Sequence, residues 1–322
     1  MSLAKRLDML ARLRSYMLGN DPTWLAAKEK AFQHNGWFTP AFIDTAIQNI
    51  AGFLEPSQLR QWLGKYPVPA AQPSPKIIGL ILSGNIPMAG IYDFICVYLS
   101  GHYQRIRLSP KDDVLTKHLV QKLLSWEPSL AGSLTVAEML KGCHAFIVTG
   151  NNNPSFLHYL KNYPGLVHTS KPSAALLTGN EDRGELELLA DDVFQYFGRG
   201  SLNIGKLYVP KGYDFIPLLK IFEKYGYLVD HNKYKNNYDY QLSLLILNKE
   251  FYMNNGSLLL TESKQPASPV ARLHYEFYED EPQFNTSERI VGRGYEPFGM
   301  ARLSVMPDKT DGQDLLKFLL EL

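Results

Sequence analysis

The spacing of hydrophobic positions changes along the chain, and the change predicts where its regions begin. Over residues 3–66, apolar side chains such as Leu7, Leu10 and Leu13 recur every three or four positions, which predicts helices with one apolar face. The proline-rich stretch YPVPAAQPSP at 66–75 cannot continue a helix, so we expect an extended connector there.

After the connector, short apolar runs alternate with helical stretches. The runs KIIGLIL (76–82), YQRIRLS and AFIVTG have the length of strands. One intervening helix is expected to end at Gly101, and Ser109-Pro110 with Asp112 predicts the N-cap and first turn of the next. Strands and helices in strict alternation predict an α/β fold built on a doubly wound parallel sheet.

The second half continues with apolar runs of strand length from about residue 173. The runs are SAALLT, KLYVP, LSLLILN, SLLLT and PVARLHYEF, and helical stretches lie among them at 184–196 and 214–225. The segment HNKYKNNYDYQ at 231–241 alternates Lys and Tyr and is expected to be a solvated loop, with a site for an acidic ligand as the alternative. We therefore expect a second α/β domain.

Composition narrows the class of protein. The chain has 322 residues, 45% of them hydrophobic, and 33 basic against 32 acidic side chains give a formal charge of +1, so we expect neither nucleic acid nor membrane as a partner. The two cysteines suit a reducing cytosol, and no signal peptide is expected at the N-terminus. The histidines form no metal motif, so no metal is predicted. A cytoplasmic protein is the resulting expectation.

Two glycine- and asparagine-containing loops follow predicted strands. LSGNIP (82–87) and VTGNNNP (148–154) end strands of the parallel sheet, where helix N-termini offer N–H groups to phosphate. Ser83 and Gly84 are therefore candidate cofactor-binding residues, and ordinary turn glycines are the alternative. Arg107, near the carboxyl end of a predicted strand, could meet a cofactor phosphate or pair with a nearby aspartate.

Ser201 lies in FGRGSLNIGKLYVP, a glycine-containing loop directly before a strand. Glycines on its amino-terminal side free the backbone, so the loop can present one hydroxyl. The nucleophile elbow of α/β-hydrolases would need glycine at 199 and 203, where Arg199 and Asn203 stand. From the pattern alone, Ser201 is either a nucleophile or a turn residue.

Several motifs in order resemble one family. NGWFTPAFIDTAIQNIAGFL, SGNIPMAGIYDF, RLSPKDD, VTGNNNPS, FGRGSLNIGKLYVP, NNYDYQ and GYEPFG are similar to stretches of bacterial acyl-CoA reductases related to the fatty-acyl-CoA reductase of bioluminescence, a branch of the aldehyde dehydrogenase superfamily. The resemblance runs from about residue 35 to the C-terminus. It implies an aldehyde-dehydrogenase-like fold with a Rossmann-like cofactor domain and a smaller α/β catalytic domain.

The resemblance also implies an activity and a set of site residues. Such enzymes reduce an acyl thioester to an aldehyde with NADPH, after a cysteine has taken the acyl group from coenzyme A. Asn85 matches the asparagine that holds the oxyanion, a credible role for an amide N–H. Thr149, Gly150 and Asn151 match the stretch that meets the cofactor pyrophosphate. Arg107 lies near a residue that contacts the adenosine ribose, which favours NADPH and leaves NADH as the alternative.

Ser201 stands where this family has its nucleophilic cysteine. A serine hydroxyl needs a positioned base, whereas a thiol is partly ionised near neutral pH. The superfamily's general-base glutamate is not evident in GLVHTSKPSAALL, where His168 is the nearest titratable group and receives no role. Ser201 is expected to lie in a cleft between domains, facing Asn85.

We therefore expect an acyl-CoA reductase acting on an acyl-CoA or acyl-carrier thioester. The alternatives are a homologue that binds the nucleotide or acyl-CoA without turnover, and an acyl transferase or thioesterase that uses Ser201. A homodimer is expected by analogy with the superfamily. The domains are predicted as N-terminal helices with the connector (1–75), a dinucleotide-binding domain (76–170), a catalytic domain (171–290) and a C-terminal return segment (291–322).

Overall fold

Contacts within the chain divide it into two units, which we describe separately. The computed structural model describes every residue except 151–159, 169–170, 281, 286 and 302–313. The first unit holds Met1–Ser170 and Ser304–Leu322, and the second holds Lys171–Leu303.

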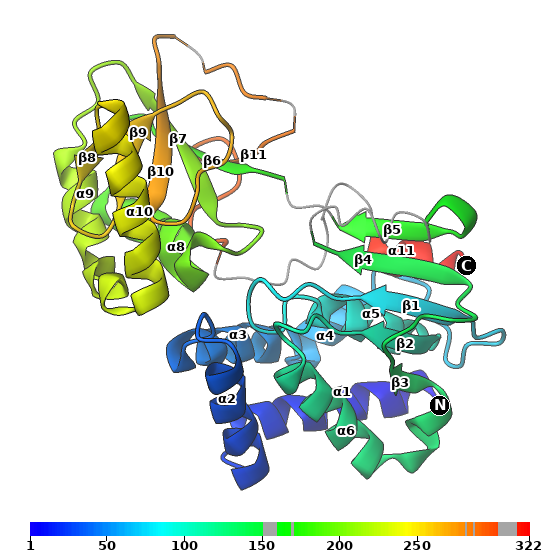
Figure 1. Ribbon diagram of the computed structural model, residues 1–322. Helices are drawn as coiled ribbons and strands as arrows, with labels where there is room; N and C mark the ends of the chain where they lie inside the picture. Colours follow the sequence, from blue (N-terminus) through cyan, green and yellow to red (C-terminus); the bar gives the residue numbers. More distant parts are fainter. Residues whose placement is uncertain (151–159, 169–170, 281, 286, 302–313) are drawn as a thin grey trace. The chain divides into compact units, whose positions relative to one another are not determined.

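Four helices precede the first strand, as the apolar spacing predicts (Figure 1). They are α1 (Leu3–Leu18), α2 (Pro22–His34), α3 (Pro40–Phe53) and α4 (Pro56–Leu63). The last three each begin with proline directly after a residue whose side chain caps the helix: Asp21, Thr39 and Glu55. Proline suits this position because its missing N–H would have no partner in the first turn. The 66–75 segment that follows is irregular, as expected.

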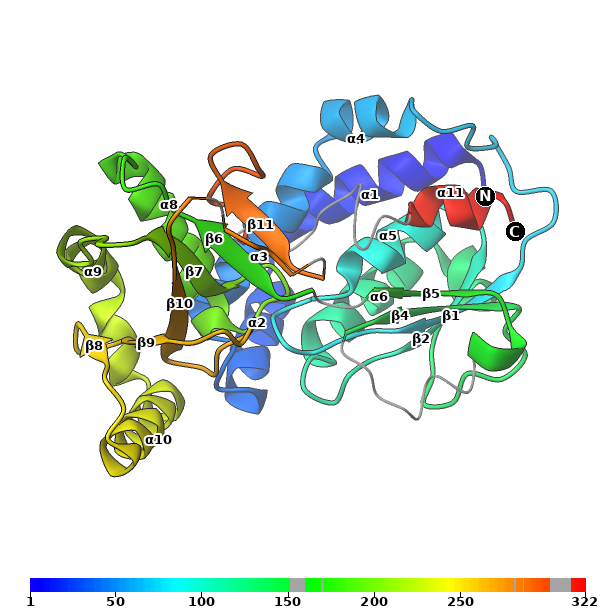
Figure 2. The same cartoon turned by 90° about the horizontal axis from the view of Figure 1, so that it is seen from above.

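The first unit is built on a five-stranded sheet, sheet A, whose paired strands all run parallel in the order β3-β2-β1-β4-β5. Its strands are β1 (Ile77–Ile81), β2 (Tyr103–Arg107), β3 (Leu134–Val136), β4 (Ala145–Thr149) and β5 (Gly165–His168). Helices α5 (Ile91–Ser100) and α6 (Val114–Trp126) connect its early strands, and α11 (Leu315–Leu320) packs on α5. Helices α1, α5 and α11 lie on one side of the sheet (Figure 2). The predicted doubly wound parallel sheet is confirmed.

Two local predictions in this unit had different outcomes. Helix α5 ends as predicted, because Gly101 adopts a left-handed φ of 85° at its C-cap. The predicted N-cap at Ser109 is wrong: α6 begins at Val114, after Asp113. The Ser109 hydroxyl instead accepts a hydrogen bond from the Lys111 backbone N–H at 3.3 Å, which makes a local turn.

The second unit is built on a six-stranded sheet, sheet B, in the order β11-β6-β7-β10-β9-β8. Its strands are β6 (Ser173–Leu176), β7 (Ile204–Pro210), β8 (Met253–Asn254), β9 (Leu259–Glu262), β10 (Arg272–Tyr278) and β11 (Arg289–Gly292). Only β8 runs antiparallel to its neighbour among these described strands. Helices α8 (Arg183–Phe194), α9 (Ile216–Phe222) and α10 (Asn232–Asn248) lie on one side of it in Figure 2.

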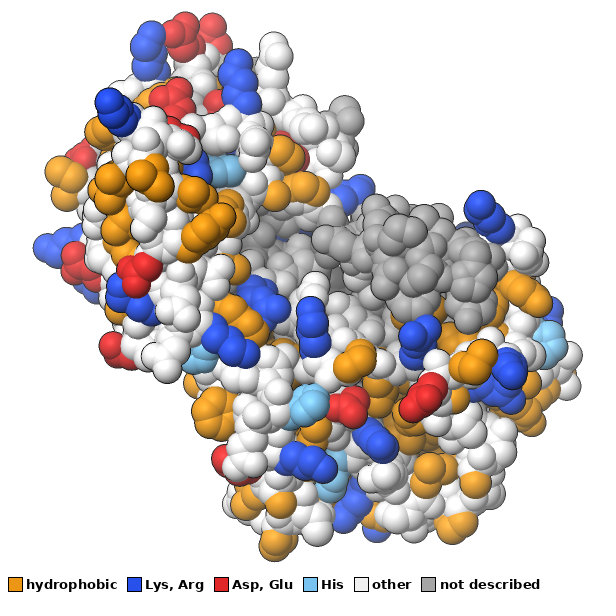
Figure 3. All heavy atoms as spheres, viewed as in Figure 1, with side chains coloured by type: hydrophobic (Ala, Val, Ile, Leu, Met, Phe, Trp, Pro, Cys, Tyr) orange, Lys and Arg blue, Asp and Glu red, His pale blue; other side chains and the backbone are white. Residues whose placement is uncertain are grey.

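Helix α10 corrects two predictions at once. The expected loop at 231–241 and the expected strand LSLLILN form this one helix. Its buried side chains are Tyr234, Tyr238, Gln241 and Leu245, which recur every three or four positions. Two of the apolar residues read as a strand are instead exposed: Ile246 is 58% and Leu247 76% exposed. Hydrophobic side chains accordingly gather over α10 in Figure 3.

Candidate active site

In the first unit, the loops that follow β1 and β4 meet at the carboxyl edge of sheet A. These two strands are neighbours, and the chain leaves β1 toward β2 on one side but returns to β4 on the other. In doubly wound sheets such a switch point is where ligands bind. The loops touch: a Cβ added at Gly150, which has a φ of 108°, would lie 3.0 Å from the Ser83 Oγ. Ser83 and Gly150 therefore share this edge.

Asn85 is exposed on the loop after β1, and a buried carboxylate holds that loop. Asp112, on the loop after β2, accepts hydrogen bonds from the backbone N–H groups of Met88 and Ala89, and burial raises its pKa well above the ordinary value. Met88 has a left-handed φ of 55°, a conformation that non-glycine residues adopt only when their surroundings hold it. The N–H groups that precede α5 are thus already bound by a carboxylate of the protein.

Gly84 lets the loop after β1 approach the loop after β2 closely. A Cβ at this position would lie 2.5 Å from the Ser109 Oγ and 2.8 Å from the Ser109 Cβ, closer than real Cβ atoms come. The turn therefore requires glycine here, and Gly84 is buried while Asn85 next to it is exposed. The sequence-predicted residues Ser83, Gly84 and Asn85 stand together on this loop.

A cluster of three polar side chains, Asp93, Thr149 and His168, lies at the carboxyl edge of sheet A. The Nδ1 atom of His168, at the end of β5, lies 3.0 Å from Asp93 Oδ1 in the first turn of α5. The Thr149 hydroxyl, at the end of β4, donates to the other oxygen of Asp93. His168 and Asp93 are 6% and 2% exposed. The resemblance predicts Thr149 at the cofactor, but the pairing could not be predicted from the sequence, because Asp93 lies in a continuous apolar helix with no local sign of a partner.

Arg107 is the last residue of β2. Its side chain and that of Arg105, two positions earlier, lie on one face of the strand, and both are half-buried. The Arg105 guanidinium donates to the Lys141 carbonyl.

The loop after β4 begins with a backbone contact to β5. Gly150 N–H donates to the His168 carbonyl at 3.1 Å, which ties β4 to β5. Asn151, the remaining residue predicted to bind the cofactor, lies outside the described residues.

In the second unit, Ser201 is exposed on the loop before β7. The preceding residues Tyr196, Phe197 and Gly198 all have left-handed φ values of 53°, 59° and 70°. Such backbone costs about 1–3 kcal/mol for each non-glycine residue and persists only when its neighbours impose it. The Phe197 ring does so: it is buried, with its centroid 4.7 Å from the ring of His231 and 5.6 Å from that of Tyr234. No hydrogen bond joins the Ser201 hydroxyl to a residue that the structure describes.

Asn203 fixes the backbone next to Ser201. Its Oδ1 accepts from the Gly200 N–H at 2.6 Å, and its Nδ2 donates to the carbonyls of Asp192 at 2.8 Å and Gln195 at 3.0 Å. This buried amide therefore joins the serine loop to the end of α8. In the sequence, Asn203 differs from the hydrolase elbow but gives no sign of this supporting role.

The PFG turn at residues 297–299 is anchored to the same helix. The Asp192 carboxylate accepts the N–H groups of Gly299 and Ala301, both at 2.6 Å. Burial raises the pKa of Asp192 to about 6, although these two hydrogen bonds oppose the shift. One residue of α8 thus holds the PFG turn with its side chain and Asn203 with its backbone carbonyl.

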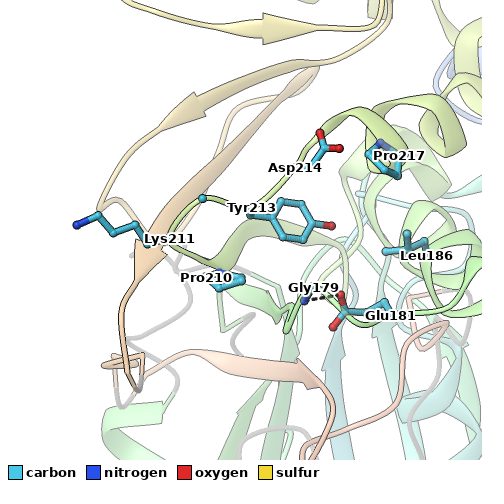
Figure 4. Close-up of a pocket in the computed structure, with 9 residues that line it drawn as sticks. Gly179, Glu181, Leu186, Pro210, Lys211, Tyr213, Asp214 and Pro217 are labelled. Carbon is cyan, nitrogen blue, oxygen red and sulfur yellow. Dashed lines mark hydrogen bonds between the residues drawn. The ribbon is translucent and has the colours of Figure 1, made fainter.

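A hollow of about 390 Å³ lies at the opposite end of β7 from Ser201. Figure 4 shows its lining, where the Glu181 carboxylate faces the Gly179 N–H and accepts its hydrogen bond at 3.1 Å. The Thr178 N–H also donates to Glu181, at 2.6 Å. None of the residues predicted from the sequence to form the active site lines this hollow.

The described residues hold no cluster of three histidine, cysteine, aspartate or glutamate side chains suited to a metal ion. Across the same residues, no helix has the length and apolar character needed to cross a membrane.

Comparison with known proteins places the fold. No protein-family model and no curated protein sequence matches the chain. The indole-3-acetaldehyde dehydrogenase AldA of Pseudomonas syringae, solved with NAD+ and IAA, matches with a TM-score of 0.65 at 12% identity, over 87% of this chain and 68% of that one. The aldehyde dehydrogenase KauB of Pseudomonas aeruginosa gives 0.63 at 12% identity, over 87% and 68% of the two chains.

A plant enzyme gives the same result. Aldehyde dehydrogenase 21 of Physcomitrella patens, in complex with the reaction product succinate, gives a TM-score of 0.64 at 9% identity, over 87% of this chain and 69% of that one. Identities this low establish the architecture alone. The chain has an aldehyde-dehydrogenase-like α/β fold, as predicted.

Proposed function

We propose that the protein is an acyl-CoA reductase that uses NADPH to convert an acyl thioester into an aldehyde, with Ser201 as its nucleophile. The observation that carries this proposal is the loop before β7. This loop exposes the Ser201 side chain. Its backbone includes three left-handed residues and is held by a buried aromatic ring and by the Asn203 amide. A turn residue without a role would not need this much support.

The chemistry requires the Ser201 hydroxyl to attack the acyl carbon. The oxygen–carbon bond forms, the carbon–sulfur bond breaks, and the thiol leaves with the proton of the hydroxyl. The Asn85 amide would donate a hydrogen bond to the oxygen that becomes negative in this step. NADPH, when bound, would supply the hydride; together with one proton from solvent, this hydride would reduce the ester to the aldehyde and free the serine hydroxyl.

The carboxyl edge of sheet A suits the dinucleotide. Gly150, with its positive φ, permits a close backbone approach beside Ser83, and Thr149, Gly150 and Asn151 would meet the pyrophosphate. Ser83 and Gly84 would complete this contact from the loop after β1. A guanidinium at Arg107 would favour the 2′-phosphate of NADPH over the free hydroxyl of NADH.

The test measures NADPH oxidation with a long-chain acyl-CoA for the native protein, Ser201→Cys, Ser201→Ala and Asn85→Ala. We expect turnover by the native protein, loss of turnover in Ser201→Ala, and a decrease of about 10²–10³-fold in Asn85→Ala, the usual cost of losing one oxyanion donor. Acyl-CoA and acyl-carrier thioesters are compared as donors. Absence of turnover by the native protein would overturn the proposal, whatever the Ser201→Cys form does.

Two other functions are outcomes of the same assay. The Ser201 hydroxyl makes no hydrogen bond to a described residue, which favours a protein that binds nucleotide and acyl-CoA without turnover. Turnover only in Ser201→Cys would support it. An oxygen ester accepts hydride less readily than a thioester, so release of thiol without NADPH oxidation would instead support an acyl transferase or thioesterase. The cytoplasmic location and the homodimer stay predictions.

A further inference from the structure

A small hollow of the first unit lies at the amino edge of sheet A, the edge opposite the loops that hold Ser83 and Gly150. Its volume is about 60 Å³, and its lining includes residues from the start of β2 and from directly before β3. Helix α1 contributes Arg6 to the lining, and helix α5 contributes Tyr98. The hollow opens to solvent beside Tyr103, which is 39% exposed.

Three side chains that line the hollow are buried and have polar atoms without a hydrogen-bond partner among the described residues. The atoms are Nε and Nη1 of Arg6, the hydroxyl oxygen of Tyr98 and Oε1 of Gln104. The three residues are 2%, 4% and 3% exposed. Because nearly all buried polar groups in proteins have partners, three such side chains around one hollow indicate a ligand.

Arg6 carries a positive charge that the described chain does not neutralise. Its Nη2 donates to the Pro69 carbonyl at 3.3 Å, and no carboxylate of a described residue pairs with it. The Glu127 carboxylate pairs with Lys5 at 2.5 Å instead. Burial lowers the pKa of Arg6, as expected for a guanidinium held away from water. A buried charge is costly without a partner, so the hollow requires a negative group.

The carboxyl end of α5 lies against the guanidinium but balances only part of its charge. Gly101 has a φ of 85° at the C-cap, and a Cβ there would overlap Nη1 of Arg6. The end of a helix carries roughly half a negative charge. No carbonyl of a described residue accepts a hydrogen bond from Nε or Nη1. About half of the charge on Arg6 is therefore left to be balanced, and two of its nitrogens still lack acceptors.

The three side chains define the ligand by what they offer. Arg6 is a donor only, and burial raises the pKa of Tyr98, so its hydroxyl keeps its proton and can donate. Oε1 of Gln104 is an acceptor, so the ligand must also carry a proton. Chloride and sulfate only accept, and water brings no charge. An oxyanion that has kept a proton meets all three requirements, and the hollow has about four times the space that one water needs.

We infer that this hollow binds a small oxyanion that carries a proton, such as hydrogen phosphate, between Arg6, Tyr98 and Gln104. The inference goes beyond the proposed function and does not rest on it, because the cofactor loops lie at the other edge of sheet A. The bound anion would link α1 to α5 and β2. A ligand that binds only the folded chain raises its melting temperature as the ligand concentration increases.

The experiment measures the affinity for inorganic phosphate by calorimetry and the melting temperature at increasing phosphate concentrations. We expect phosphate to bind the native protein, and Arg6→Met to weaken this binding at least about 100-fold, because two hydrogen bonds to a charged group are lost. Phosphate should therefore raise the melting temperature of the native protein more than that of Arg6→Met. Methionine removes the unpaired charge and keeps an apolar stem of similar length, so the variant should fold.

Two further variants test the hollow if Arg6→Met does not fold. Gln104→Glu puts a carboxylate into the hollow, where it should neutralise Arg6 and repel an anion, so phosphate binding should be lost. Tyr98→Phe removes one donor and should weaken binding about tenfold. Unchanged phosphate affinity in Gln104→Glu would overturn the inference.

Arg14→Met is the matched control. Arg14 lies on the same helix and loses the same charge, but it donates to the Ala51 carbonyl at 2.9 Å and does not line the hollow. Its loss should leave phosphate affinity unchanged. Sulfate at the same ionic strength stabilises proteins by exclusion from their surface, so it should raise the melting temperatures of the native protein and Arg6→Met equally.

The outcomes separate this inference from the proposed function. Phosphate bound at the cofactor loops would remain in Arg6→Met, so only the binding lost in that variant counts. Equal phosphate affinity in the native protein and Arg6→Met, or no phosphate binding by the native protein, would overturn the inference and show a hollow that holds only water. Neither result changes the NADPH oxidation assay, and a protein that fails that assay should still bind phosphate here.

Discussion

A buried aspartate supports the loop that carries Asn85 directly, and another supports the loop that carries Ser201 indirectly. In each case a buried aspartate accepts two backbone N–H groups: Asp112 in the first unit and Asp192 in the second. Asp112 bonds directly to the turn that follows Asn85. Asp192 bonds the PFG turn, and the serine loop reaches it only through Asn203, which contacts the Asp192 carbonyl.

This difference has a physical consequence. The loop of Asn85 depends on a side chain that substitution can remove. The link from Asn203 goes to a backbone carbonyl, which every amino acid at position 192 would supply. The serine loop has additional support from its buried aromatic ring, Phe197. We therefore expect the first loop to be the more sensitive of the two to a single substitution at its aspartate.

The largest expected effect is that of Asp112→Ala. It leaves the Met88 and Ala89 N–H groups without their acceptor, and each such buried group costs about 1–3 kcal/mol. We expect a loss of about 4 kcal/mol in the free energy of unfolding, measured in urea, with faster hydrogen exchange at these two amides. Asp112→Asn, which keeps an acceptor oxygen, should lose less than half as much. Unchanged exchange at Met88 and Ala89 would contradict the role given to Asp112.

The next effect is the pH dependence that Asp192 adds. Its pKa is raised from the ordinary 3.8 to about 6, so the folded chain keeps a proton that the unfolded chain releases between these values. Stability from this group is present below about pH 4 and falls as the pH rises to about 6, by up to about 3 kcal/mol, with no further change above.

The measurement is urea unfolding at several pH values for the native protein and for Asp192→Asn. The difference between the two removes the contribution of Asp112, whose pKa is also raised. Hydrogen exchange at Gly200 should be the same in both proteins, because Asn203 holds that amide and bonds only the backbone of residue 192. Faster exchange at Gly200 in Asp192→Asn would show that the serine loop depends on the Asp192 side chain, as the loop of Asn85 depends on Asp112.

The sheet-forming runs and the site residues differ in how well sequence predicts them. The apolar runs that became β1 and β4 are bounded by glycine and proline, so their strands could be predicted. β3 and β5 are only 3 and 4 residues long and were missed. LSLLILN was misread as a strand because a short apolar run does not distinguish strand from helix. The signal for α10 lay in the spacing of Tyr234, Tyr238 and Leu245 among lysines.

In the site, loops could be predicted but their supports could not. Glycine and asparagine after a strand predicted the loops of Asn85 and Gly150, and glycines before a strand predicted the loop of Ser201. Asp112 and Asp192 accept hydrogen bonds from backbone N–H groups far away in the sequence. The residue type does not reveal which backbone N–H group a side chain will bind. Such partners become visible only when the fold brings the segments together.

The smallest expected effect concerns Arg107, which is predicted to bind a ligand and not to support a loop. Arg107→Gln should lower the affinity for NADPH about tenfold more than that for NADH, because a hydrogen bond to a charged group contributes about 1.5–3 kcal/mol. Dissociation constants of both nucleotides, measured by calorimetry, give the ratio. Arg105→Gln is the matched control, since Arg105 shares the strand face but donates to the Lys141 carbonyl. If both substitutions change the ratio of the two dissociation constants equally, the preference for NADPH comes from the charge of the strand rather than from Arg107. The cofactor site would then have no specific phosphate contact on β2.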